Sequence, residues 1–291
     1  MAISGGMGPA ETGRELRFGC TRCGACCNRA PEVALSEAAG LADMFVFRLM
    51  FRLYDLPRAG AGAEYFESRR LLNHFAVRKS TAKLRQGGKP VEHVRYLTVS
   101  ALSLDTEAGA CAARHDGGCS IYARRPLACR TVPFHYSRPE AAAERDLAAF
   151  VATPDYRCET GLGAPVVLAA GRIVDEAALR ARRDAAALAE RDQPWAEAIL
   201  RRLRAGDPDL PGLREIEANA AFGATTVSMH TAWQVAAEAG LIDAAACRAL
   251  IATQAALIDR LLAAPGCEPD AREMLMEMRA EYAALRPVAP A

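Results

Sequence analysis

Four cysteines stand close together near the start of the chain, in the pattern Cys20-x-x-Cys23-x-x-Cys26-Cys27. A spacing of two residues lets a tight loop aim neighbouring thiolates at one metal centre, with backbone amides facing the sulfurs, and Gly24 supplies the conformational freedom for this curl. The adjacent sulfurs of Cys26 and Cys27 cannot easily both bind one tetrahedral ion. The run therefore indicates a second metal, or one multi-iron cluster that is approached from two sides.

Four further cysteines follow in the same part of the chain, so that eight thiols divide into two four-coordinate sites. Each tetrathiolate zinc, or each oxidised four-iron cluster with four thiolates, carries about −2 by formal counting. Cys247 and Cys267 stand apart, in an expected helix and an expected turn, and we interpret them as structural. The predicted metal ligands are Cys20, Cys23, Cys26, Cys27, Cys111, Cys119, Cys129 and Cys158.

The charge of the chain is unevenly distributed, although its net value is only +1. Residues 1–158 carry 22 Lys and Arg against 16 Asp and Glu, whereas residues 159–291 carry 14 against 19. The small total argues against a strongly basic nucleic-acid binder, and the local excess would nearly cancel two dianionic metal sites. Six arginines within five residues of a cysteine are candidate counter-charges: Arg22, Arg29, Arg114, Arg124, Arg125 and Arg130.

The compartment can also be predicted from the sequence. The N-terminus lacks the basic and apolar regions of a signal peptide, and the most apolar stretch, 44–51, is too short to span a bilayer. We therefore expect a cytoplasmic protein without membrane contact. Clustered cysteines in a reducing compartment are typical of metal or redox chemistry rather than of disulfides.

Helical and extended patterns alternate up to about residue 165, and helical patterns dominate beyond it. In the first part we expect a helix over 37–55 with Ser36 as its N-cap, a helix over 64–79, strands over 91–104, a helical turn over 125–129, and an Ala-rich helix with a strand at 147–153. In the second part we expect helices over 174–191, 194–205, 212–221, 228–239, 243–263 and 270–285.

These patterns predict an α+β, mostly helical fold in two parts. A small cysteine-rich metal-binding domain with few short strands would span residues 18–165, and an all-α C-terminal domain would span residues 166–291. The boundary is soft, because the later helices could pack directly onto the first part.

Two cysteine-bearing blocks give the chain a family resemblance. The blocks run from Phe18 to Cys27 and from Gly118 to Phe134, and Cys111 and Cys158 match outlying cysteines. Together they resemble the CxxCxxCC family of zinc- or iron-chelating proteins, with which the flagellin lysine N-methylases are grouped. The resemblance covers about residues 18–160. It implies a metal-thiolate centre and, more weakly, methylation of protein lysines with S-adenosylmethionine.

Iron–sulfur chemistry and zinc both suit such a site, and spacing alone does not separate them. We favour one or two [4Fe–4S] clusters, because a C-x2-C-x2-C curl suits a cube with four corners, while zinc with a structural role stays an alternative. The C-x3-C-x2-C spacing of radical enzymes is absent. Gly161-Leu162-Gly163 lacks the strand and helix of a doubly wound methyltransferase and is interpreted as a loop. For a methyl donor, Arg125 and Arg130 are candidates to bind its carboxylate.

Two functional classes therefore stay open. In the first, the chain is an enzyme that acts on a protein substrate, with lysine N-methylation as the leading candidate. In the second, the metal only stabilises a structural or protein-interaction module that has no catalysis. A substrate-sized cavity beside the metal would favour the first class, and closed four-cysteine sites under Phe18, Ile121 and Phe134 would favour the second.

Overall fold

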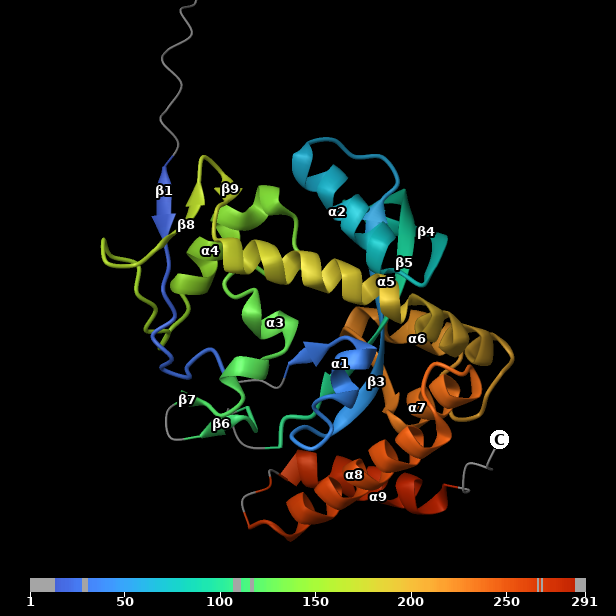
Figure 1. Ribbon diagram of the computed structural model, residues 1–291. Helices are drawn as coiled ribbons and strands as arrows, with labels where there is room; N and C mark the ends of the chain where they lie inside the picture. The colour runs from blue at the N-terminus through green and yellow to red at the C-terminus, as the bar shows by residue number, and fades with distance from the viewer. Residues whose placement is uncertain are drawn as a thin grey trace, which may run out of the picture.

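The computed structural model describes residues 14–27, 31–106, 111–115, 118–265, 267 and 269–285 (Figure 1). Helices outweigh strands among these residues, and both occur in one chain. This confirms the predicted α+β, mostly helical class. No described helix has the combination of length and apolar character that crossing a bilayer requires.

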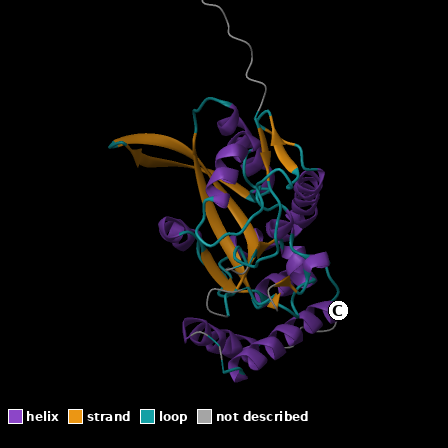
Figure 2. Cartoon of the chain, turned by 90° about the vertical axis from the view of Figure 1, so that its left-hand side faces the viewer, coloured by secondary structure: helices purple, strands orange, loops and turns teal. Residues whose placement is uncertain are grey.

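The central sheet is built on two long antiparallel strands, β3 (Phe47–Pro57) and β5 (Lys89–Ser103), whose pairing runs from Phe47 opposite Ser103 to Pro57 opposite His93. The strand β4 (Arg78–Gln86) joins β5 in a hairpin through Gly87 and Gly88. Two short strands complete the sheet: β2 (Glu32–Val33) pairs with β5, and β10 (Thr225–Ser228) pairs with β3. Figure 2 shows the long strands from the side.

The helix predicted over 37–55 is wrong for most of its length. Only α1 (Leu35–Ala39) is helical there; a turn follows over 40–44, and β3 begins at Phe47. Phe47, Leu49 and Phe51 alternate onto the core, so these residues satisfy a period of two as well as a helical stripe. Pairing with β5 along the whole strand then decides the outcome. Ser36 is not the N-cap either; it lies inside α1, and its N–H donates to Asp192 at 2.9 Å.

Other predicted elements in this part are confirmed with one exception. The strand β5 and the short helix α3 (Leu127–Arg130) lie where patterns placed them. The helix predicted over 64–79 is α2 (Ala63–Phe75), which ends earlier because β4, which was not predicted, begins at Arg78. The predicted strand at 147–153 is wrong, because α4 (Ala143–Val151) covers most of it. Ala143 and Leu147, four residues apart, are both buried, which is the spacing of one helical face.

The later helices lie where they were predicted, except that the two helices predicted over 174–191 and 194–205 form one continuous helix. The helix α5 (Glu176–Arg204) continues through Pro194 and buries residues on both sides of it, including Ala185 and Ile199. Packing on both halves outweighs the cost of proline inside a helix. The remaining helices are α6 (Leu213–Asn219), α7 (His230–Glu238), α8 (Ala244–Ala263) and α9 (Pro269–Ala284).

Short strands hold the segments around the cysteines. A small sheet joins β1 (Glu15–Arg17) to β8 (Val166–Ala169) and β8 to β9 (Arg172–Ile173). A two-stranded hairpin pairs β6 (Arg114–His115) with β7 (Gly118–Cys119).

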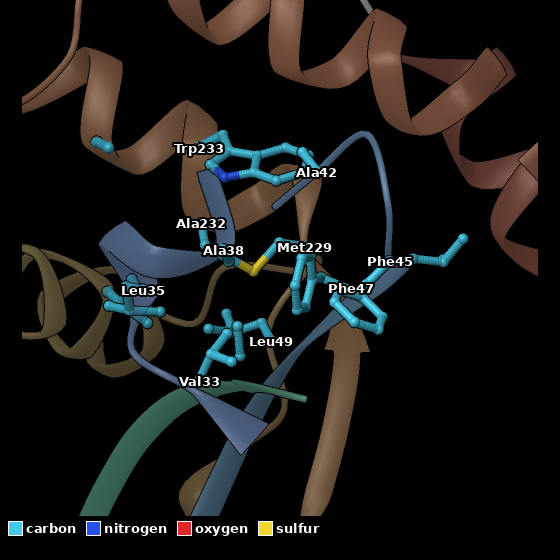
Figure 3. Packing of buried hydrophobic residues seen from close by; sticks show 14 of the residues in the cluster. Val33, Leu35, Ala38, Ala42, Phe45, Phe47, Leu49, Met229, Ala232 and Trp233 are labelled. Atoms are coloured by element: carbon cyan, nitrogen blue, oxygen red, sulfur yellow. The ribbon is translucent and has the colours of Figure 1, made fainter. Parts of the chain in front are cut away.

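The main core lies between the central sheet and the C-terminal helices, so it draws on both sides of residue 165. Figure 3 shows Phe45, Phe47 and Leu49 packed against Met229 and Trp233. A second buried cluster lies under the β1–β8–β9 sheet and includes Phe18, Phe134, Leu147, Val167 and Leu168. The part after residue 165 therefore supplies β10 to the central sheet and much of the packing behind it. With β8 and β9 it holds three strands, so the prediction that this part is all-α is wrong.

Gln254 links α8 to the chain that enters β3. Its fully buried amide accepts from Phe47 N–H at 2.9 Å and donates to the carbonyls of Ala42 and Phe45 at 2.6 and 2.7 Å. Because a buried polar group that loses its partner costs about 1–3 kcal/mol, we predict that Gln254→Ala lowers the free energy of unfolding by about 3 kcal/mol or more. Urea unfolding measures this. The control Gln86→Ala removes an exposed amide and should change it little; equal effects would contradict the assignment.

Candidate metal centre

The predicted curl over residues 20–27 is present as a tight loop packed against Arg114. Gly24 has a left-handed backbone with φ +74°, and the N–H of Cys27 donates to the Gly24 carbonyl at 3.0 Å. A Cβ on Gly24 would lie 2.7 Å from Nε of Arg114. The loop thus needs glycine for its backbone conformation and for the close approach of a guanidinium.

The first end of the loop is tied to the segment that holds Cys158. Gly19 and Glu159 form an antiparallel bridge with N–H···O distances of 2.7 and 3.0 Å, and the Thr21 hydroxyl donates to the Arg157 carbonyl at 2.8 Å. Cys20 and Cys158 each adjoin this bridge. Burial raises the pKa of Cys158, and the nearby thiols of Cys23 and Cys20 raise it further.

The second end of the loop is tied to the segment that holds Cys111. The N–H of Cys111 donates to the Cys27 carbonyl at 2.9 Å, and the β6–β7 hairpin that follows pairs Arg114 with Cys119. Cys129 lies on α3. Burial raises the pKa of Cys129 to about 12, and the thiols that raise it further are those of Cys111, Cys27 and Cys119.

Backbone amides and neighbouring thiols decide the protonation of the loop cysteines. The backbone N–H of Ala25, then that of Arg157 and the Thr21 hydroxyl, lower the pKa of Cys23. Cys26 and Cys27 share a hydrogen bond, which raises the pKa of Cys26 and lowers that of Cys27; Arg114 and Arg125 lower the latter further. The loop therefore stabilises the thiolates of Cys23 and Cys27, the form that binds metal, whereas Cys26 keeps its proton.

The arginines fall into two groups. Arg22 and Arg125 lie over the ring of Tyr122, with their Cζ atoms 4.3 and 3.7 Å from its centroid, and Arg114 packs on Gly24. The others pair with acids outside the cysteine loops: Arg124 lies 3.4 Å from Asp43 and Arg130 lies 3.8 Å from Asp184. Arg29 lies outside the described residues.

The chemistry of the donor set fits a thiolate-bound metal. The eight cysteines come from four stretches of chain; backbone hydrogen bonds tie residues 20–27 to the segments of Cys111 and Cys158, and Arg114 and Arg125 lie near Cys27. Among the described residues, no three His, Cys, Asp or Glu side chains lie close enough to hold a single ion as they stand. Cys247 is fully buried in the main core, and Cys267 packs against that core.

A cavity of about 520 Å³, partly open to solvent, adjoins Cys23. Its wall includes the guanidinium-bearing residues Arg114 and Arg157 and the ring of Tyr156, together with the turn at Asp155. A cavity of this size admits a small organic ligand. The cysteine loop is therefore open to solvent at Cys23.

A larger cavity of about 680 Å³ lies between the central sheet, α2 and α5. Glu32 accepts from Arg52 at 2.9 Å and from the Ser100 hydroxyl at 2.8 Å, and Glu37 accepts from the N–H of Leu127 at 2.8 Å. Burial raises the pKa of Glu37. Leu127 begins α3, so the wall of this cavity and Cys129 share one short helix.

Sequence reasoning missed this larger cavity, because its polar residues are scattered over β2, α1, β3 and β5 without a common motif. Tyr136 also lines it, with its ring stacked on that of His135 at a centroid distance of 4.4 Å. Apolar side chains complete the lining, among them Leu72, Phe75, Leu127 and Leu188. The cavity combines carboxylates with an apolar wall.

A comparison with protein families matches residues 19–159 to the CxxCxxCC family, whose description is "Putative zinc- or iron-chelating domain". This confirms the resemblance that the cysteine blocks carry. No curated protein and no solved structure matches the chain.

We predict that Gly24→Ala destabilises the cysteine loop by more than its backbone strain alone. A left-handed alanine costs about 1–2 kcal/mol, and here Arg114 must also move. The control Gly171→Ala has nearly the same backbone, φ +72°, with nothing within 4 Å of the new Cβ. Urea unfolding should show the larger loss for Gly24→Ala. Equal losses would mean that Arg114 does not pack on the loop.

Proposed function

We propose that the CxxCxxCC domain of this chain binds iron as [4Fe–4S] clusters through Cys20, Cys23, Cys26, Cys27, Cys111, Cys119, Cys129 and Cys158. The observation that supports this is the pair of backbone ties between the loop at 20–27 and the segments of Cys111 and Cys158. The family description supports zinc or iron. Within that choice, the C-x2-C-x2-C curl of Cys20, Cys23 and Cys26 suits a cube with four corners.

The chain's own residues would hold the charge of such a cluster. Backbone N–H groups around Cys23 donate toward sulfur, and Arg114 and Arg125 lie beside Cys27. Because a thiolate cluster is anionic, these groups offset repulsion among the ligands. When bound, a [4Fe–4S] cluster supplies a one-electron redox centre. We place the domain at residues 18–165, the helical part at residues 166–291, and the protein in the cytoplasm, where the thiols stay reduced.

We predict that protein purified without oxygen shows a broad absorption band at roughly 400 nm, with about four iron and four sulfide per site. Iron, zinc and acid-labile sulfide counts measure this directly. Cys267→Ser, outside the proposed ligand set, should keep the full iron content. A colourless protein with one or two zinc ions would refute the iron–sulfur proposal and leave a zinc-stabilised structural or interaction module.

We further propose protein lysine N-methylation as the activity, with S-adenosylmethionine as methyl donor. The family resemblance motivates this, and the 680 Å³ cavity supports it, because its carboxylates suit an ammonium group and its leucines suit an alkyl chain. Glu37, whose pKa burial raises, suits the acceptance of the ammonium proton. The amine nitrogen then bonds to the methyl carbon as the carbon–sulfur bond breaks, with its electron pair left on sulfur.

Arg125 and Arg130 are the proposed partners of the donor's carboxylate. Arg125 donates its Nε–H to the Tyr122 carbonyl at 3.2 Å, which leaves its terminal nitrogens for a carboxylate. Arg130 would have to release its contact with Asp184, which is partly exposed and therefore weak.

We predict that Tyr136→Phe lowers methyl transfer to poly-L-lysine by about tenfold, the effect of losing one hydrogen bond to a charged group. The fold should stay intact, because the substitution keeps the ring that packs against Phe75 and His135. Mass spectrometry of the lysines measures the transfer. The control Tyr65→Phe, whose hydroxyl bonds to the Pro57 and Arg58 carbonyls outside the cavity, should keep the rate. No transfer by the iron-loaded wild-type protein would refute the activity.

A further inference from the structure

The eight cysteines form two sets of four, and we propose that each set binds its own metal centre. The first set is Cys20, Cys23, Cys26 and Cys158, and the second set is Cys27, Cys111, Cys119 and Cys129. This inference rests on the proposed metal binding and adds the number of centres and the ligands of each.

An antiparallel pairing brings the first set together. The strand β1 pairs with β8, with Arg17 opposite Val166, and the Gly19–Glu159 bridge continues the same two chains toward the cysteines. Cys20 and Cys158 leave this bridge on neighbouring chains. The Thr21 hydroxyl adds a third tie at the Arg157 carbonyl, and the Arg157 N–H reaches the sulfur of Cys23.

Cys26 completes the first set. Apart from its neighbour Cys27, the thiols that raise the pKa of Cys26 by their charge are those of Cys20 and Cys158, so these sulfurs lie near it. The thiols that raise the pKa of Cys158 are those of Cys23 and Cys20, and both belong to the first set. These four sulfurs therefore share one neighbourhood.

A second antiparallel pairing brings the other set together. Glu32 of β2 lies opposite Leu102 of β5, and the N–H of Ser103 then donates to the Pro31 carbonyl at 3.2 Å. The same two chains meet again where the Cys111 N–H donates to the Cys27 carbonyl at 2.9 Å. Cys27 thus precedes β2 and Cys111 follows β5 at the same end of the sheet.

The hairpin and α3 supply the other two ligands of the second set. A turn from Cys111 leads into β6, the N–H of Ser120 donates to the Ala113 carbonyl at 2.8 Å, and Cys119 lies on β7. The thiols that raise the pKa of Cys129 are those of Cys111, Cys27 and Cys119, and all three belong to the second set. The neighbours of Cys158 and the neighbours of Cys129 therefore give the same division of the eight cysteines into two sets.

The peptide bond between Cys26 and Cys27 is the border between the two centres. Because each residue serves a different centre, the difficulty of aiming adjacent sulfurs at one ion does not arise. The two centres then lie side by side. Arg114 stands at this border: it packs on Gly24, lines the cavity at Cys23 and lies near Cys27. A guanidinium there offsets the repulsion between two anionic centres.

The two centres differ in access. Cys20 is exposed and Cys23 lines the open cavity, whereas Cys111 is buried and Cys27 and Cys119 pack against the main core. A chelator should therefore remove metal from the first set before the second.

The test uses the neighbouring variants Cys26→Ser and Cys27→Ser in the full chain, reconstituted with iron and sulfide. We expect each to keep about half of the wild-type iron, with different centres lost. Cys26→Ser should match Cys158→Ser in its electron paramagnetic resonance spectrum, although these residues are far apart in sequence. Cys27→Ser should match Cys129→Ser, and the double variant Cys26→Ser/Cys27→Ser should lose nearly all iron. Cys267→Ser is the matched control.

Matching spectra for Cys26→Ser and Cys27→Ser, or total loss from either one, would overturn the two sets. A wild-type protein with metal for only one centre would also overturn them, while metal binding itself would stand. Wild-type protein that takes up neither iron nor zinc would instead refute the proposed function. Metal release to a chelator supplies a test that needs no variant: two phases of about equal size are expected, and a single phase would contradict the proposal.

Discussion

Antiparallel pairing at two sheet ends is the constraint on which the cysteine centre depends. Four stretches of chain must bring thiols together, yet none of the cysteine loops has a hydrophobic core of its own. The β1–β8 ladder places Cys20 beside Cys158, and the β2–β5 ladder places Cys27 beside Cys111. Residues 20–27 connect the two sheets. Pairing in the two sheets therefore stabilises this region, and the cysteine loops can adopt the geometry that a bound metal requires.

Part of this arrangement could be predicted from the sequence because it is local. The spacing of Cys20, Cys23 and Cys26, and the need for Gly24, follow from the reach of a short loop, and the later helices follow from periodicity. The partner of Cys20 could not be predicted. It depends on β1, a strand of three residues whose pairing with β8 is a contact between chain segments some 150 residues apart.

The strand β3 shows why the central sheet and the larger cavity could not be predicted from the sequence. Its first aromatic and aliphatic residues, Phe47 to Phe51, fit a helical stripe and an alternating strand about equally well. The choice is made by β5 along the full length of the strand and by Gln254, which binds the backbone at its start. Residues of β3 line the 680 Å³ cavity, so the prediction of a helix over 37–55 could not reveal the cavity either.

The short helix α3 joins Cys129, one of the proposed metal ligands, to that cavity. Four residues are too few to form a stable helix alone, so α3 depends on its ties. At its start the Leu127 N–H donates to Glu37, and within it lies Cys129, whose pKa is raised by burial and by the thiols of Cys111, Cys27 and Cys119. A metal bound by Cys129 would fix α3 and, through Leu127, the position of the Glu37 carboxylate in the cavity. Thiolate ligation at one end of α3 and carboxylate placement at the other are then parts of a single constraint.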